Sequence, residues 1–349
     1  MKQLLIFIHY NKNNKLADYI IYTLKNIKHL FKKIIFISNS QLSEENKLKL
    51  NGLYDIIKIR DNKGFDFGAW KDALLNEGWK NIISYDNITL MNDTCFGPLY
   101  DIKIIYDKMN KNNIDFWGLT EQIATNTGMP GTDDPVPAHI QSYFMFFNNK
   151  IINSNIFQNF WNNVLYEETV EIVIQKYETQ LTNILINNGF NCEAFFKAEG
   201  ITNLSIFNPD LCIINSVPFI KIKSFLYFQD IDIIKKLLQE MTNYPFSLIT
   251  DHYFNIYKPS DTYLLIYKNE LNKKIRELEE TRDYINGINE ILNNKNEELK
   301  NNINELENSK NFKIGKIILF FPRLVKNIFK KIININKKNT DKDDNNVKN

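Results

Sequence analysis

Apolar positions in the first part of the chain form short continuous runs separated by stretches of helical spacing. The runs, rich in β-branched residues, predict strands at residues 4–9, 34–38 and 56–59. Between them, apolar residues three or four positions apart predict a helix over 16–27, and Ser43 is placed to cap a second, short helix that ends near residue 50. Strands separated by helices indicate a parallel sheet with right-handed crossovers. The sequence therefore predicts an α/β fold of the nucleotide-binding type.

A fourth apolar run, within residues 88–98, ends on polar residues. It reads Ile-Thr-Leu-Met-Asn-Asp-Thr-Cys-Phe-Gly-Pro, which predicts a buried strand with Asn92 and Asp93 at its carboxyl end. Open α/β sheets bind ligands at that edge. A carboxylate there suits a divalent ion that holds a diphosphate, because hard cations prefer oxygen ligands. The alternative is that Asp93 only caps a helix or closes a turn.

A polar stretch follows the third predicted strand, over residues 61–75. Asn62 and Gly64 predict a turn, and Asp66 lies at the start of a helix that continues to residue 75. Glycine lets the backbone approach a ligand closely, and a helix amino terminus offers free N–H groups to an anion. A second ligand contact is expected here, unless Asp66 is only a helix cap and Gly64 only a turn residue.

The composition indicates one large globular domain with appendages. The chain has 349 residues, of which 44% are hydrophobic and 13% aromatic. Its three cysteines lack metal or disulfide spacing, and no apolar run suits a signal peptide or a membrane span, so a cytosolic location is expected. The net charge of +2 does not suggest nucleic acid as a partner, but residues 310–338 carry Lys and Arg without any acid.

The carboxyl-terminal part shows a heptad repeat. Apolar residues recur every seven positions: Leu264, Leu271, Leu278, Ile285, Leu292, Leu299 and Leu306. This spacing predicts a coiled coil, although polar residues such as Lys274 and Asn302 at the second core position indicate a weak coil, a coil that packs on another protein, or a single solvated helix. The expected division is a domain at 1–266, a coiled coil at 267–308, a basic amphipathic segment at 309–338 and a disordered end at 339–349.

The basic amphipathic segment alternates apolar and cationic residues around Pro322, which is expected to kink or restart the helix. Such a segment lies in a membrane interface, where each cation near anionic lipid adds about 1 kcal/mol. Docking to a protein partner is the alternative.

Several ordered motifs resemble those of the rhamnan synthesis F family over roughly residues 1–230. They are Asn62-x-Gly-x-Asp-Phe-Gly-Ala-Trp-Lys, Met91-Asn-Asp-Thr-Cys-Phe-Gly-Pro, Asp115-Phe-Trp-Gly-Leu-Thr, His139-Ile-Gln-Ser-Tyr-Phe, Tyr177-Glu-x-x-Leu-Thr, Asn208-Pro and Val217-Pro-Phe-Ile-Lys. The resemblance implies a GT-A-like glycosyltransferase fold. It also implies synthesis of rhamnose-containing surface polysaccharides from a nucleotide-sugar donor, commonly dTDP-rhamnose.

The resemblance also implies roles for single residues. GT-A enzymes hold the metal and the donor diphosphate with an Asp-x-Asp motif, and the corresponding tripeptide here is Met91-Asn92-Asp93, which keeps only the last carboxylate. Asp93 is then the expected ligand of Mn²⁺ or Mg²⁺ and a catalytic residue. The other expected donor contacts are Asn62, Gly64, Asp66 and Asn92. Many glycosyltransferases also have the pattern Glu-Asp-x-Asp-Leu followed by a helix that ends in Gly, and when Leu181 and Gly189 are aligned with it, Tyr177-Glu178 falls on Glu-Asp. Glu178 is then the expected general base, with an ordinary surface glutamate as the alternative.

A loop rich in Thr, Gly and Pro, residues 122–137, follows a predicted strand at 115–119. Loops of this length are usually functional or mobile, so it is either an acceptor-side flap or a plain surface loop. His139 and Gln141 follow, alternate on one face of a strand that continues to residue 147, and are expected to point into one cleft as acceptor or sugar contacts. A structural hydrogen bond is the favoured alternative for His139. His252 is a minor candidate for a late metal ligand.

The resulting hypothesis is a cytoplasmic glycosyltransferase, peripheral on the inner face of the cytoplasmic membrane. It would extend a lipid-linked glycan of a polysaccharide or lipopolysaccharide, and its coiled coil would form a homo-oligomer or bind other synthases. Two alternatives stay open. The same fold could use another donor sugar, or the chain could be a membrane-tethered scaffold with a lapsed transferase domain, as the missing first carboxylate suggests.

Overall fold

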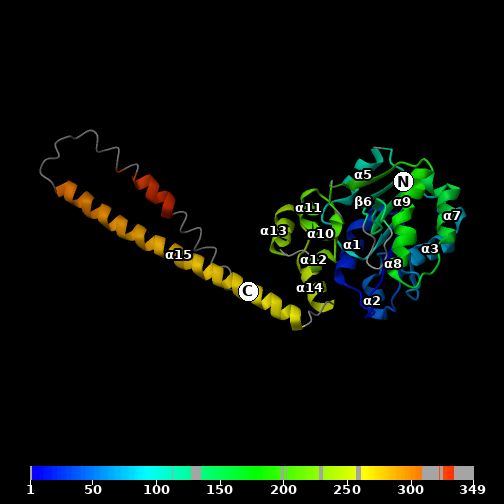
Figure 1. Ribbon diagram of the computed structural model, residues 1–349, viewed down its shortest axis with the longest axis horizontal. Coiled ribbons are helices and arrows are strands. Elements are labelled where there is room, and N and C mark those ends of the chain that lie inside the picture. The colour runs from blue at the N-terminus through cyan, green and yellow to red at the C-terminus, as the bar shows by residue number, and fades with distance from the viewer. Residues whose placement is uncertain are drawn as a thin grey trace. The chain divides into compact units, whose positions relative to one another are not determined.

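The computed structural model describes residues 2–111, 113–126, 135–197, 200–201, 203–227, 231–256, 261–308, 322 and 325–333. The chain divides into two compact units, with the division at residues 258 and 259 (Figure 1). The expected end segment at 339–349, most of the basic segment at 309–338, and residues 127–134 of the expected flap lie outside the described residues. No helix among the described residues combines the length and apolar character needed to cross a bilayer.

Eight strands of the described residues form the main sheet, in the order β3-β2-β1-β4-β8-β6-β7, with β9 also paired to β6. Their bounds are β1 (Gln3–His9), β2 (Lys33–Ser38), β3 (Ile56–Ile59), β4 (Asn87–Asn92), β6 (Phe116–Gln122), β7 (His139–Ile140), β8 (Phe144–Asn148) and β9 (Cys192–Phe196). The pairs β3-β2, β2-β1, β1-β4 and β6-β9 are parallel, whereas β8 runs antiparallel between β4 and β6. The predicted α/β fold with a mostly parallel sheet is confirmed.

Helices cover both faces of this sheet, because its central strands are apolar on both sides. In β1, Leu5 and Phe7 belong to one core, and the alternating residues Leu4, Ile6 and Ile8 belong to the other. The first core is completed by α1 (Asp18–Ile27), α5 (Ile102–Lys111), α10 (Leu204–Phe207), α11 (Pro209–Ile214), α12 (Ser224–Tyr227), α13 (Ile231–Met241) and α14 (Ser247–Ile256). Figure 1 shows α1 with α10, α11 and α13 on one side of the sheet and α3, α7 and α9 on the other.

Most of the buried tryptophan side chains belong to the second core. It is formed by α3 (Phe65–Glu77), α4 (Trp79–Ile82), α6 (Asn149–Ile152), α7 (Asn155–Asn163), α8 (Val170–Val173), the π-helix η2 (Ile174–Glu178) and α9 (Thr179–Asn187). Trp161 is completely buried, and its ring stacks on Phe67 at 5.6 Å between centroids. Outside these two layers lie the short helices η1 (Lys28–Leu30) and α2 (Glu44–Lys49), and Ser43 caps α2 as predicted.

The strand order creates a crevice at the carboxyl edge of the sheet. The chain passes from β1 outward to β2 and β3, and then returns to place β4 on the other side of β1. At such a switch point the loops leave in opposite directions and open a ligand site. His9 ends β1, and Asn92 ends β4 directly opposite Ile8.

A two-stranded ribbon lies next to this crevice. It consists of β5 (Cys95–Phe96) and β10 (Ile220–Lys221), which are antiparallel. The turn after β5 contains a cis peptide between Gly97 and Pro98. Gly97 has a φ of 152°, and a Cβ atom there would lie 2.4 Å from Phe219, so only glycine fits. The ribbon thereby brings residues after 220 to the end of β4.

The second unit contains α15 (Asp261–Asn308) and a helical stretch at residues 325–333. The heptad residues Leu278, Ile285 and Leu292 of α15 are 65%, 51% and 53% exposed. The predicted long helix is therefore present, and these three heptad side chains lie on its surface.

Candidate functional site

Asp93 lies at the carboxyl end of β4, where the sequence placed it. Its Oδ2 atom accepts a hydrogen bond of 3.0 Å from the backbone N–H of Tyr10 and lies 4.0 Å from Nε2 of His9. The alternative that Asp93 closes the turn is wrong. The turn is closed by Asn92, whose Oδ1 accepts hydrogen bonds from the backbone N–H and the hydroxyl of Thr94 at 3.2 and 2.6 Å. Asp93 therefore connects the ends of β1 and β4.

Asp66 lies in the first turn of α3 and faces the end of β4. The helix cap is Gly64, with a left-handed φ of 68°, so the alternative that Asp66 is only a cap is wrong. Its Oδ2 atom instead accepts a hydrogen bond of 2.8 Å from Nδ2 of Asn92. A Cβ atom on Gly64 would approach Cα of Tyr166 to 3.0 Å, so glycine is needed there for both backbone angle and space.

The two aspartates repel one another in a partly dehydrated crevice. Burial raises the pKa of Asp66 to about 6, and the charge of Glu178 adds to this effect. Burial also raises the pKa of Asp93 well above its usual value, and the charge of Asp66 raises it further. His9 does not compensate, because its own burial lowers its pKa to about 4 and leaves the ring neutral at pH 7. Cation binding would therefore stabilise the ionised form of both aspartates.

Glu178 ends the π-helix η2, an irregular helical form that is common at functional sites. It is half-buried, and its Oε1 atom accepts a hydrogen bond of 2.8 Å from the backbone N–H of Ser142. This bond fixes the direction of the carboxylate. Glu178 is therefore not a freely solvated surface residue.

His139 and Gln141 lie near Glu178 but not on the strand that was expected. The strand β7 ends at Ile140, and Gln141 lies in the turn before β8. His139 Nδ1 is 2.8 Å from the carbonyl oxygen of Pro137. The side chain of Gln141 accepts a hydrogen bond from Thr120 and donates one to Asn203. Both residues thus have structural hydrogen bonds, and both line the same cavity, as predicted.

Two adjoining cavities contain most of these side chains. The larger, of about 500 Å³, is lined by Asp66, Asn92, His139, Gln141 and Glu178, among others. The smaller, of about 340 Å³, is lined by Asp93 and by His9, Tyr10, Asn11, Lys12 and Lys15 from the end of β1 and the following loop. Thr94 and Lys223 line both cavities. The arrangement can hold an elongated ligand with one end in each cavity.

Asn62 and Gly64 line neither of these two cavities. The Oδ1 atom of Asn62 accepts a hydrogen bond of 3.0 Å from Nδ2 of Asn39, and Arg60 Nη1 donates one of 2.8 Å to Oδ1 of Asn39. Their position indicates that they shape the loop before α3, and the donor contact expected of them remains a prediction.

His252 lines the smaller cavity but lies against aromatic rings. Its ring is perpendicular to those of Tyr19 and Phe96, at 4.8 and 5.5 Å between centroids, and burial lowers its pKa to about 4. Among the residues that the structure describes, no group of three or more His, Cys, Asp or Glu side chains is arranged to hold a metal ion.

The sequence interpretation missed the cationic side chains of the site. Lys221 and Lys223 line the larger cavity, and no role was assigned to either of them. Lys221 belongs to the motif that begins at Val217, which was the only available signal. Its position beside the aspartates depends on the pairing of β10 with β5, in which Lys221 is paired with Cys95, 126 positions earlier in the chain.

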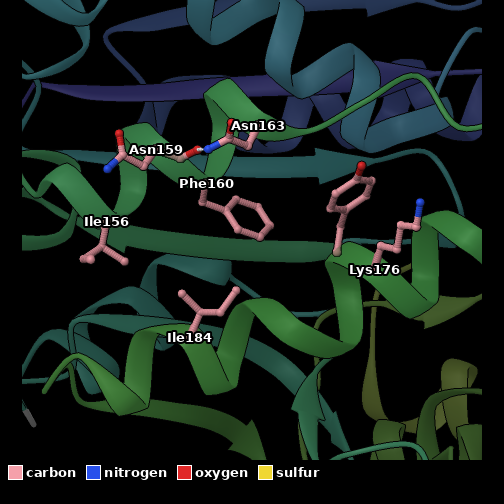
Figure 2. Close-up of a pocket in the computed structure, with 7 residues that line it drawn as sticks. Ile156, Asn159, Phe160, Asn163, Lys176 and Ile184 are labelled. Atoms are coloured by element: carbon pink, nitrogen blue, oxygen red, sulfur yellow. Dashed lines mark hydrogen bonds between the residues drawn. The ribbon is translucent and has the colours of Figure 1, made fainter. Parts of the chain in front are cut away.

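A separate cavity of about 340 Å³ lies between α7 and the helices η2 and α9. Figure 2 shows Phe160 and Ile184 projecting into it from facing helices, with Asn159 and Asn163 on one rim and Lys176 on the other. Lys176 is paired with Glu167 at 3.1 Å. None of the predicted site residues lines this cavity, so it is not the candidate active site.

Comparison with known proteins gives both a family and distant relatives. Residues 34–339 match the family described as rhamnan synthesis protein F. An uncharacterized protein, y4gN, of Sinorhizobium fredii is 25% identical over 178 residues, which are 50% of this chain and 44% of that protein. The virulence protein VirA of Vibrio anguillarum is 27% identical over 179 residues, which are 50% of this chain and 52% of that protein. The chain thus spans about half the length of these relatives.

Among solved structures, a putative nucleotide-diphospho-sugar transferase from Desulfovibrio desulfuricans aligns with 69% of this chain and 99% of its own. The two share 10% sequence identity, and the TM-score is 0.36.

Proposed function

The chain belongs to the rhamnan synthesis protein F family, and from this premise we propose that it is a glycosyltransferase with a GT-A-like first unit. It transfers a sugar from a nucleotide-sugar donor to a hydroxyl group of a growing cell-surface glycan. The observation that carries the proposal is the convergence of Asp66, Asp93 and Glu178, from three separate parts of the chain, on two adjoining cavities that share Thr94 and Lys223 at the carboxyl edge of the sheet. A donor with its nucleoside in the smaller cavity and its sugar in the larger one fits this arrangement.

The carboxylates of the chain have different roles in this reaction. The acceptor oxygen forms a bond to the anomeric carbon while the bond from that carbon to the diphosphate breaks. Glu178 receives the acceptor proton, because its carboxylate is held by Ser142 at the wall of the sugar-side cavity. Asp93 and Asp66 organise the diphosphate end, and Asn92 holds Asp66 in place.

A divalent cation, Mn²⁺ or Mg²⁺, fits this site as an ion shared with the donor. Asp93 would hold it, and Asp66 could contribute a second carboxylate oxygen. Mg²⁺ is commonly bound by one or two carboxylates together with substrate phosphates, which suits the absence of a larger ligand cluster among the described residues. When bound, the ion neutralises the charge that develops on the departing diphosphate.

The donor sugar is proposed to be rhamnose, supplied as dTDP-rhamnose, since this is the sugar that the family resemblance implies. Calorimetry of the full chain with dTDP-rhamnose and a panel of UDP- and GDP-sugars, with and without Mg²⁺, tests this choice. We expect selective binding of one donor that strengthens with the metal. Binding of another sugar nucleotide would assign a different donor and leave the glycosyltransferase assignment unchanged. No binding by the folded protein would favour a scaffold role.

The second unit is proposed to hold the enzyme at the inner face of the cytoplasmic membrane, near a lipid-linked acceptor. Exposed heptad residues on α15 support pairing with a second helix, from another copy of this chain or from another synthase. In the helical stretch 325–333, the apolar residues that recur at helical spacing are 39–54% exposed: Val325, Ile328, Phe329, Ile332 and Ile333. Lys326, Lys330 and Lys331 lie between them.

We expect the full chain to float with vesicles that contain anionic lipid and not with neutral vesicles. Lys330→Gln should weaken binding to the anionic vesicles about fivefold, because one cation near such a surface contributes about 1 kcal/mol. Lys300→Gln on α15 is the matched control and should bind as the wild type does. Equal flotation with neutral and anionic vesicles, or none with either, would contradict the membrane assignment.

A further inference from the structure

Two lysines reach the candidate active site from the ribbon formed by β5 and β10. Lys221 is paired with Cys95, two residues after Asp93. The backbone N–H of Ile222 donates a hydrogen bond of 2.9 Å to the carbonyl oxygen of Thr94, which extends the pairing by one residue. The ribbon therefore fixes Lys221 and Lys223 beside the end of β4.

The two lysines occupy different parts of the site. Lys221 lines the larger cavity, together with Asp66 and Glu178, whereas Lys223 lines both cavities. A nucleotide-sugar has its diphosphate between the nucleoside and the sugar. A donor that spans both cavities must therefore place its diphosphate at their junction, which is marked by Thr94 and Lys223.

The two lysines bring positive charge to the site, and the charge of Lys221 lowers the pKa of Asp66. Among the residues that the structure describes, neither ammonium group takes part in an ion pair, whereas Lys33 and Lys150 each pair with a carboxylate at 2.8 and 2.7 Å. The Lys221 ammonium lies 5.2 Å from the centroid of the Tyr143 ring, which is a cation–π contact. Lysines that line a cavity and form no direct ion pair with a described residue are suited to bind phosphate.

We propose that Lys221 and Lys223 bind the diphosphate of the donor, with Lys223 at the phosphate attached to the nucleoside and Lys221 at the phosphate attached to the sugar. This inference rests on the proposed glycosyltransferase function and adds to it the residues that stabilise the leaving group. When the bond between the anomeric carbon and the phosphate oxygen breaks, its electron pair stays on that oxygen. The sugar-side phosphate thus gains one negative charge, and Lys221 is the nearer cation to receive it.

Calorimetry of the full chain with dTDP, UDP and GDP, and with the corresponding monophosphates, tests the assignment. Lys221→Met should weaken binding of the preferred diphosphate about tenfold and leave the monophosphate unchanged, because only the diphosphate reaches Lys221. Lys223→Met should weaken both nucleotides about tenfold. Lys80→Met, an exposed lysine on α4 outside both cavities, is the matched control and should change neither.

A second pair of variants keeps the test decisive if Lys221→Met disturbs the fold. Lys221→Arg should retain most of the diphosphate affinity, and Lys221→Gln should lose it, at melting temperatures equal to that of the wild type. Unchanged diphosphate affinity in the Met and Gln variants, with a binding wild type, would overturn the lysine assignment alone. A folded wild type that binds no nucleotide would overturn the proposed function and this inference together.

Discussion

Asp93→Asn is expected to lower the rate of sugar transfer by about 100- to 1,000-fold while leaving the fold intact. Removal of one group that stabilises charge in the transition state has effects of this size. Asparagine keeps an oxygen that can accept the hydrogen bond from the backbone N–H of Tyr10, so the connection between β1 and β4 is preserved and only the negative charge is lost. Donor binding should weaken as well, because Asp93 lies at the diphosphate end of the site.

The measurement is transfer of radiolabelled sugar together with calorimetry of donor binding in the presence of Mg²⁺. Asp107→Asn, which removes an exposed carboxylate paired with Lys103 on α5, is the control and should behave as the wild type does. If Asp93→Asn transferred sugar at the wild-type rate, the assignment of Asp93 to metal and diphosphate would be wrong.

Glu178→Gln is expected to reduce transfer by about 100- to 10,000-fold without a loss of donor affinity. A positioned general base contributes this much to a rate. Glutamine can still accept the hydrogen bond from the Ser142 N–H at the position of Oε1, so the geometry of the cavity wall should survive and proton removal should not. The contrast with Asp93→Asn is diagnostic, because one variant loses both binding and transfer and the other loses transfer alone.

Glu171→Gln is the matched control, since Glu171 is an exposed glutamate on α8, seven residues earlier. It should leave both donor binding and transfer unchanged. Glu178 would be only a structural acceptor for the Ser142 N–H if its Gln variant kept full transfer. In that case the base must be sought among the other groups that line the sugar-side cavity.

The raised pKa values of the two aspartates explain why these carboxylates are suited to bind a cation that is shared with a phosphate group. Burial raises the pKa of both Asp66 and Asp93. Repulsion from the charge of Glu178 raises the pKa of Asp66 further, and repulsion from the charge of Asp66 raises that of Asp93. Such a pair is costly for the free protein, because dehydration disfavours the charged form. A bound cation would favour the ionised form of both aspartates, and buried carboxylates with raised pKa values are typical of functional sites.

The sequence by itself determined the sheet and the position of Asp93. Continuous apolar runs predicted β1, β2 and β3 closely. β1 and β2 are buried on both faces and leave a strong local signal, and the half-buried β3 has a similar apolar run. The fourth apolar run changes to polar residues at Asn92 and Asp93, and this local change placed Asp93 at the carboxyl edge of the sheet. Local pattern also located Ser43 as a helix cap.

Only the tertiary structure decided which polar side chains share a cavity and what each one binds. It showed that Asn92 serves Asp66 and Thr94, that Asn62 supports a loop through Asn39, and that Gln141 bridges Thr120 and Asn203. It also brought Lys221 to the aspartates through the pairing of β10 with β5. Hydrophobic periodicity reports whether a position is buried within its own element. The partner of a polar side chain depends on segments far away in the chain, and no local pattern encodes that distance.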